Sequence, residues 1–214
     1  MDHVGVFGGT FDPIHLGHLI PAEYACNHFR LKRLLLVPSA APVHRPRHNP
    51  ASGQHRLRMC RLAAASLGPF EVSDVEVSRS EPSYTIITLR YLAETLGPGV
   101  KLVLLVGEDN LPTVHTWRRI DEILDLATVA ILPRPVSGPL DVGPAEAALG
   151  RDTVQAILGR TVPAPRVPIS ASDIRSRVAE GKPIAGLVPA SVARYIAETG
   201  IYSDSACRDH ASAF

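Results

Sequence analysis

The sequence has few cysteines and no long apolar run. Its three cysteines, Cys26, Cys60 and Cys207, lie far apart and form no CxxC pair, which argues against a disulfide framework and a cysteine zinc site. No apolar run approaches the roughly 20 residues that span a bilayer, and the N-terminus lacks the basic region and apolar stretch of a signal peptide. We therefore expect reduced thiols, no protein-bound metal, no membrane partner and a cytoplasmic location.

Acidic residues are absent from one long stretch. No Asp or Glu occurs at the 47 positions from 24 to 70, which hold eight of the chain's 22 Lys and Arg residues. The formal net charge of +1 is too small to indicate binding of nucleic acid through overall positive charge, so we expect no nucleic-acid partner. Any single arginine in the stretch could simply be solvated, but the stretch as a whole favours a site for a small anion.

Strand-like and helix-like segments alternate along the first two thirds of the chain. Short apolar runs typical of buried strands occur at 4–7, 34–37, 70–77, 100–106 and 128–132. Segments with helical spacing occur between them, at 19–29, 54–67, 84–96, 110–114 and 117–125. This alternation with short connections predicts an α/β fold, a doubly wound parallel sheet whose ligands bind at the carboxyl ends of the strands.

The last third of the chain has a different composition. We expect an irregular surface stretch at 133–150, a short helix at 151–158 and an edge strand at 162–169, despite three prolines in that last segment. Two further helices are expected, one capped by Ser170 or Ser172 and running to about Glu180, and one over 189–198. At 214 residues the length suits one domain, placed at 1–202, with a flexible tail at 203–214.

The loop from Gly8 to His18 reads GGTFDPIHLGH and joins the first strand to the first helix. A glycine-bearing turn before a helix N-terminus suits an anion. His15 and His18 are three positions apart at the helix entrance, so they can project the same way and each donate a hydrogen bond to a phosphate. The glycines match neither GxGxxG nor the phosphate-loop pattern, so neither a nicotinamide-dependent dehydrogenase nor a phosphate-loop NTPase is supported.

This loop, with its HxGH ending, strongly resembles the nucleotidyltransferase superfamily. Residues 169–175, ISASDIR, resemble its second motif, ISSTxIR. Residues 107–111, GEDNL, with Trp117 resemble the GxDxL…W block of the nicotinate-nucleotide adenylyltransferases, and residues 82–89 resemble the SYT…TL segment of the same family. The resemblance extends over roughly 4–202 and implies a Rossmann-like nucleotidyltransferase fold with C-terminal helices.

The resemblance implies an activity. A nicotinate-nucleotide adenylyltransferase transfers AMP from ATP, bound with Mg²⁺, to nicotinate mononucleotide, giving deamido-NAD and pyrophosphate in NAD biosynthesis. The acceptor phosphate is already an anionic nucleophile, so the in-line attack on the α-phosphorus requires no general base. A sister adenylyltransferase acting on nicotinamide mononucleotide or phosphopantetheine remains an alternative, as does a catalytically silent nucleotide-binding regulator. The sequence leaves open whether the chain forms a homo-oligomer.

The resemblance also implies roles for single residues. The expected catalytic residues are His18 on the α-phosphate, His15 on the triphosphate, and Arg45 and Arg175 on the pyrophosphate. The expected ATP site further includes Gly8, Gly9, Thr10, Phe11, Gly107, Asp109, Ile169, Ser170 and Ser172. The expected acceptor site comprises Thr10, His44, Arg45, Tyr84, Thr85, Trp117 and Arg118. Within these sites we expect Asp109 to bind the adenosine ribose and Trp117 to stack on the pyridine ring.

Two positions depart from the family's motifs. Arg45 stands where the family commonly has a lysine, and a planar guanidinium does not simply replace a compact ammonium in a phosphate site. Ala171 stands where a serine is usual, which removes one side-chain donor. Near the start of the helix expected at 54–67, we interpret Arg56 as structural rather than as a ligand of substrate.

Overall fold

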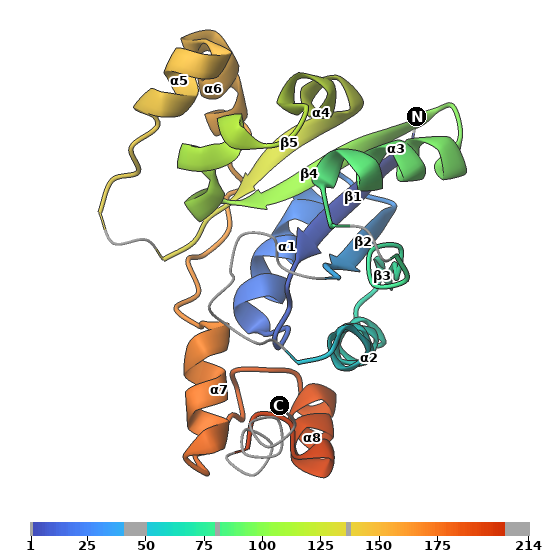
Figure 1. Cartoon of the computed structure of the whole chain (residues 1–214), viewed down its shortest axis with the longest axis vertical. Helices are drawn as coiled ribbons and strands as arrows, with labels where there is room; N and C mark the ends of the chain where they lie inside the picture. The colour runs from blue at the N-terminus through green and yellow to red at the C-terminus, as the bar shows by residue number, and fades with distance from the viewer. Residues whose placement is uncertain (1, 41–50, 80–81, 136–137, 204–214) are drawn as a thin grey trace.

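A five-stranded parallel sheet forms the centre of the computed structural model, which describes residues 2–40, 51–79, 82–135 and 138–203 (Figure 1). The strands are ordered β3-β2-β1-β4-β5, and every pairing is parallel. Their bounds are β1 (Asp2–Gly9), β2 (Arg33–Pro38), β3 (Phe70–Val72), β4 (Val100–Gly107) and β5 (Ala127–Leu132). Since the chain moves outward from β1 in both directions, the predicted doubly wound sheet is confirmed.

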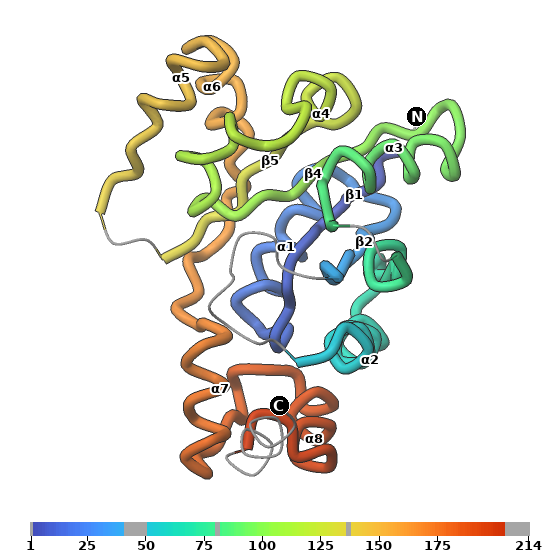
Figure 2. The backbone as a smooth tube through the Cα atoms, in the orientation of Figure 1, coloured from blue at the N-terminus to red at the C-terminus, as the bar shows by residue number. Residues whose placement is uncertain are grey.

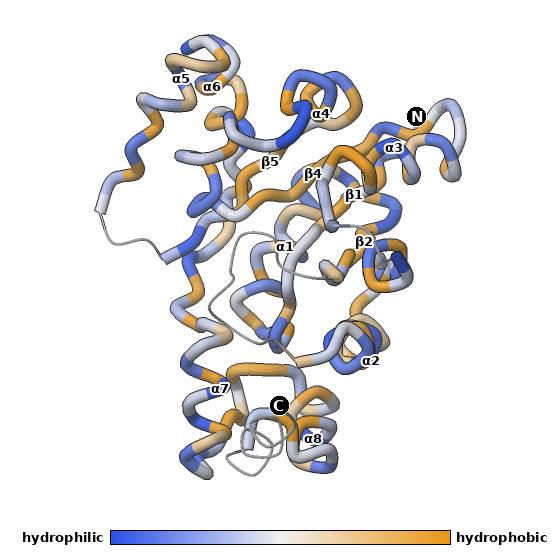
Figure 3. Tube along the Cα trace, viewed as in Figure 1, coloured by the Kyte–Doolittle hydropathy of each residue, from blue (hydrophilic) through white to orange (hydrophobic). Residues whose placement is uncertain are grey.

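Helices cover both faces of this sheet. One face packs against α1 (Leu16–His28) and α2 (Gly53–Ala64); the other packs against α3 (Thr85–Leu96), α4 (Ile120–Leu126), α5 (Gly143–Leu149) and α6 (Arg151–Leu158). The alternation along β1 explains the two layers, because Phe7 belongs to the first core, whereas Val4 and Val6 belong to the second. Figure 3 shows the apolar residues running along the central strands, between the two helical layers.

Two C-terminal helices, α7 (Ala171–Ala179) and α8 (Ala190–Thr199), lie beyond the carboxyl ends of the strands. The trace in Figure 2 runs from α6 past the sheet and down into α7. Ile174 of α7 and Val192 of α8 are buried in the same core as α1 and α2. The predicted C-terminal helices are confirmed, and none of the described helices is long and apolar enough to cross a membrane.

The predicted strand at 70–77 is wrong beyond Val72. Strand β3 has only three residues, Phe70–Val72, and the chain then turns. Val75 is buried all the same, in the core that contains the α3 residues. Its apolar side chain therefore contributes to the core without belonging to a ladder of backbone hydrogen bonds.

Two predictions in the last third are also wrong. Residues 162–169 form no strand. A single bridge between Thr161 and Ile131 precedes them, and the three prolines of the segment supply no N–H to a ladder. The stretch predicted to be irregular contains α5, which has a proline in its first turn followed by alanines and a glutamate. The assignment of 1–202 to one domain stays a prediction, and all but Ser203 of the predicted tail lies outside the described residues.

Candidate functional site

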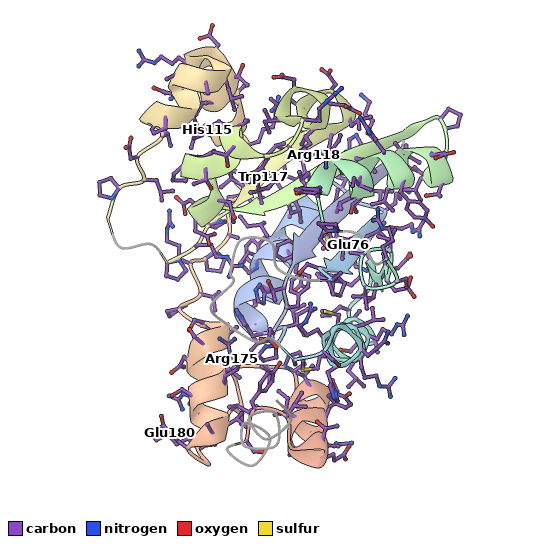
Figure 4. The ribbon with its side chains drawn as sticks, in the orientation of Figure 1. Glu76, His115, Trp117, Arg118, Arg175 and Glu180 are labelled. Atoms are coloured by element: carbon purple, nitrogen blue, oxygen red, sulfur yellow. The ribbon has the colours of Figure 1, made fainter. Side chains whose placement is uncertain are left out.

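A cavity of about 350 Å³ lies at the carboxyl ends of β1 and β4. Its walls come from the loop after β1, the start of α3, the segment after β4 and the start of α7. Figure 4 shows Arg175 on the α7 side of this region, Trp117 on the segment after β4 and Glu76 beside β2 and β3. Ten of the predicted site residues line it: Gly8, Gly9, Thr10, Phe11, His18, Thr85, Gly107, Asp109, Trp117 and Arg175.

His18 is held on both sides by other rings. The His15 ring stacks on it with centroids 3.7 Å apart, and the Phe11 ring meets it edge-on at 5.2 Å. The backbone N–H of His15 donates to His18 Nδ1 at 3.3 Å, so Nδ1 acts as an acceptor and we assign a ring proton to Nε2. The cavity is thus lined by a rigidly packed imidazole that carries one N–H donor.

His15 is buried behind this ring. It is 1% exposed, does not line the cavity, and its Nδ1 has no hydrogen-bond partner among the described residues. Burial, together with the charge of Arg134, lowers the pKa of His15 from 6.5 to about 3. His15 is therefore neutral near pH 7, and its expected contact with the triphosphate stays a prediction.

The lowered pKa of His15 predicts a pH dependence of stability. The unfolded chain protonates this residue below pH 6.5, whereas the folded protein does so only near pH 3, so the contribution of His15 is complete above pH 6.5 and is lost as the pH falls. From pH 7 to pH 5 the free energy of unfolding should fall by about 2 kcal/mol more in the unaltered protein than in His15→Gln. Urea unfolding at both pH values measures this, with His28→Gln, an exposed position on α1, controlling for the loss of an imidazole. Parallel pH profiles for the protein and His15→Gln would contradict it.

Two glycines allow close approaches around the cavity. A Cβ at Gly17 would lie 2.9 Å from His15 Nδ1 and 3.0 Å from the carbonyl oxygen of Ile169. A Cβ at Gly107 would lie 2.5 Å from Asp109 Oδ1. Real Cβ atoms essentially never show the distances of 2.9 and 2.5 Å, so a side chain at Gly17 would displace His15 and one at Gly107 would displace Asp109. The 3.0 Å approach to Ile169 is tight and would push the segment entering α7 slightly away.

The start of α7 contributes Ala171 and Arg175 to the cavity wall. Of the two serines predicted as candidate caps, Ser170 is the N-cap of α7, and its Oγ accepts from the Asp173 N–H at 3.1 Å. Ser170 and Ser172 are exposed, with their hydroxyl oxygens 3.1 Å apart, and like Ile169 they do not line the cavity. The contacts expected between these three residues and ATP stay predictions.

The expected acceptor residues divide into two groups. Thr85 and Trp117 line the cavity, whereas Tyr84 and Arg118 lie outside its wall and contact each other, with the guanidinium 5.0 Å from the ring centroid. Their expected contact with the acceptor stays a prediction. His44 and Arg45 lie outside the described residues.

Similarity to known proteins agrees with this arrangement. Residues 6–177 match the family model described as cytidylyltransferase-like. A relative from Thermomicrobium roseum is 41% identical over 203 residues, covering 94% of this chain and 92% of the relative. One from Desulfitobacterium hafniense is 38% identical over 200 residues, covering 93% and 95%. Each is named a probable nicotinate-nucleotide adenylyltransferase. The chain belongs to the nicotinate-nucleotide adenylyltransferase family.

Solved structures related to this family share its fold. A Plasmodium falciparum nicotinic acid mononucleotide adenylyltransferase complexed with NaAD has a TM-score of 0.72 to this chain, covering 94% of this chain and 98% of the other at 16% identity. The same protein complexed with APC has a TM-score of 0.71. The predicted Rossmann-like nucleotidyltransferase fold and the predicted membership of the nicotinate-nucleotide adenylyltransferase family are both confirmed.

Sequence reasoning missed several cavity residues of this nicotinate-nucleotide adenylyltransferase family member. Arg134 lines the cavity two positions after β5, and its backbone N–H donates to Glu108 Oε2 at 3.1 Å. Its place after a predicted strand was a usable signal, since ligands meet a parallel sheet at such ends. On the α3 side, buried Glu76 accepts a hydrogen bond from the Thr88 hydroxyl at 2.6 Å, and both residues line the cavity. No sequence pattern marked Glu76, because it lay inside a wrongly predicted strand.

Proposed function

We propose that this protein transfers AMP from ATP to nicotinate mononucleotide, giving deamido-NAD and pyrophosphate. The observation that carries the proposal is a single cavity lined both by phosphate-binding types of residue, His18 and Arg175, and by a tryptophan suited to a flat ring. The names of the curated relatives support the same reaction.

The phosphate end of the cavity must bring two anions together. The acceptor phosphate attacks the α-phosphorus in line and pyrophosphate leaves, so the protein aligns the reactants and stabilises charge. The Leu16 N–H, the first amide of α1, donates to the Leu187 carbonyl at 2.9 Å. Because this amide is already hydrogen-bonded within the protein, side chains become more important as donors to phosphate. We assign the α-phosphate to the His18 N–H and the leaving pyrophosphate to the Arg175 guanidinium, with Arg45 as a second proposed clamp.

Magnesium enters this proposal as part of the substrate, bound to the triphosphate of ATP. The described residues contain no group of three or more His, Cys, Asp or Glu side chains that could hold a metal ion. With nucleotides, Mg²⁺ binds chiefly phosphate oxygens and water. Within the cavity wall, Asp109 is assigned to the ribose of the adenosine.

The other end of the cavity suits an aromatic ring that bears a negative charge. Trp117 lines this end and is partly buried, so its face can stack on a pyridine ring. Thr85 is the first residue of α3, whose first turn contains no acidic residue. The positive end of the α3 dipole therefore favours the ring carboxylate of nicotinate over the neutral amide of nicotinamide.

Pyrophosphate release tests this function. With ATP and Mg²⁺, nicotinate mononucleotide should give a kcat/KM about fivefold above that of nicotinamide mononucleotide, because a charge at a helix N-terminus is worth roughly 1 kcal/mol. Phosphopantetheine should give no turnover above background. The order of the three acceptors is measured with a coupled pyrophosphate assay on the purified chain.

Two results would contradict the proposal. ATP binding without turnover on any acceptor would leave a silent nucleotide-binding regulator. Preference for nicotinamide mononucleotide or phosphopantetheine would indicate a sister transferase. The cytoplasmic location and the homo-oligomeric state stay predictions.

A further inference from the structure

Asp12 connects the cavity to three distant parts of the chain. It is 3% exposed and lines the cavity beside Thr10. Its Oδ1 accepts hydrogen bonds from the Ala51 N–H at 3.1 Å and from the Tyr202 hydroxyl at 2.6 Å. Its backbone carbonyl accepts from Arg175 Nη1 at 2.7 Å. The loop after β1 is thus bonded to the start of α2, to α7 and to the segment after α8.

The Asp12 carboxyl group also competes for Arg175. Its Oδ2 lies 3.7 Å from Arg175 Nη1, whereas a direct bond between a guanidinium and a carboxylate is roughly 2.7–2.9 Å long. A small rotation of the carboxyl group would close that gap. Arg175, which already donates to the Asp12 backbone carbonyl, would then also bond directly to the carboxylate, and its attraction for a phosphate in the cavity would fall.

The Tyr202 hydroxyl opposes such a rotation. At 2.6 Å, its bond to Oδ1 is shorter than the bond from Ala51 and fixes one oxygen of the carboxyl group. Burial and the neighbouring Asp12 charge both raise the pKa of Tyr202, so the phenol keeps its proton and remains a donor. The partners are 190 positions apart in sequence, and this contact exists only because the chain after α8 returns to the β1 loop.

We propose that Tyr202 is a positioning residue for the phosphate end of the cavity: by holding the Asp12 carboxyl group, its hydroxyl keeps the Arg175 guanidinium available to the polyphosphate. This inference rests on the proposed function only in taking Arg175 as a ligand of ATP and pyrophosphate. It assigns a role in phosphate binding to a residue that does not itself line the cavity.

Tyr202→Phe tests the inference, with Tyr195→Phe as its matched control. Tyr195 is in α8, and its hydroxyl is 2.7 Å from His55 Nδ1, away from the cavity wall. In the full chain, Tyr202→Phe should raise the dissociation constant of pyrophosphate and the KM for ATP about five- to tenfold, since part of a charge-assisted contact is lost. The KM for the acceptor should change less than twofold. Tyr195→Phe should leave all three values within about twofold.

A second substitution separates positioning from loss of structure. In Tyr202→Phe combined with Asp12→Asn, the neutral amide no longer attracts the guanidinium, so pyrophosphate binding should recover to within about twofold of the unaltered protein. Unchanged pyrophosphate binding in Tyr202→Phe would overturn the inference, as would equal losses in the two tyrosine variants or no recovery in the double variant.

Calorimetric titration of pyrophosphate requires no acceptor. Its outcome therefore remains interpretable if the proposed acceptor is wrong. Failure of the proposed function would instead appear as absent turnover in the unaltered protein.

Discussion

Replacing His18 with alanine should lower kcat about 100- to 1000-fold, while the dissociation constant of ATP changes less than about fivefold. The effect is large because the ring is fixed before substrate arrives, between His15 at 3.7 Å and Phe11 at 5.2 Å. A donor held in place without reorganisation stabilises charge that grows on the α-phosphate in the transition state more than it stabilises bound ATP. Turnover is measured by pyrophosphate release, and ATP binding by titration calorimetry.

Two further variants make the His18 result specific. His18→Asn keeps an N–H donor of shorter reach and should recover part of the lost turnover, whereas His28→Ala, at the exposed end of the same helix, should leave it unchanged. Equal losses in ATP binding and in turnover would show that His18 holds the ground state and has no special role in the transition state.

Most of the sheet could be predicted because its strands are buried on both faces. Runs such as Leu34–Val37 and Val100–Val106 are apolar at nearly every position, which is typical of central parallel strands. Strand prediction failed where a residue is buried without belonging to a strand, or where an extended segment does not pair with the sheet. Val75 is buried in the core although it lies outside any strand. The prolines of 162–169 interrupt a segment that follows a single bridge at Thr161 and forms no strand.

The site residues that lie within sequence motifs could be predicted. His18, Arg175, Asp109 and Trp117 lie in segments with a recognisable order of residues, and the fold brings all four to one cavity. The contacts that support them could not be found in this way. The bond from Tyr202 to Asp12 spans 190 positions and involves a tyrosine in no motif, because it depends on where α8 docks and not on a local pattern.

Replacing Arg56 with methionine should lower the free energy of unfolding by about 3–5 kcal/mol. Arg56 is 1% exposed, and its guanidinium donates to the carbonyl oxygens of Thr10 at 2.8 Å, Ala40 at 2.8 Å and Ala51 at 2.9 Å. Burial lowers the pKa of Arg56, and the charge of Asp12 opposes that shift. Methionine preserves the apolar part of the side chain but leaves the three carbonyl groups without this donor. A buried acceptor without a hydrogen-bond partner destabilises the folded state, because it has lost its bonds to water.

Urea unfolding measures the loss, and Arg58→Met provides the control. Arg58 is an exposed arginine of the same helix, α2, where a surface substitution should change the free energy of unfolding by about 0.5 kcal/mol or less. Equal changes in the two variants would contradict the interpretation of Arg56 as structural. A large loss confined to Arg56→Met would show that one buried guanidinium holds α2 to the β1 loop, whose Thr10 lines the cavity. At least one positive charge of the acid-free stretch from 24 to 70 would then have a structural role.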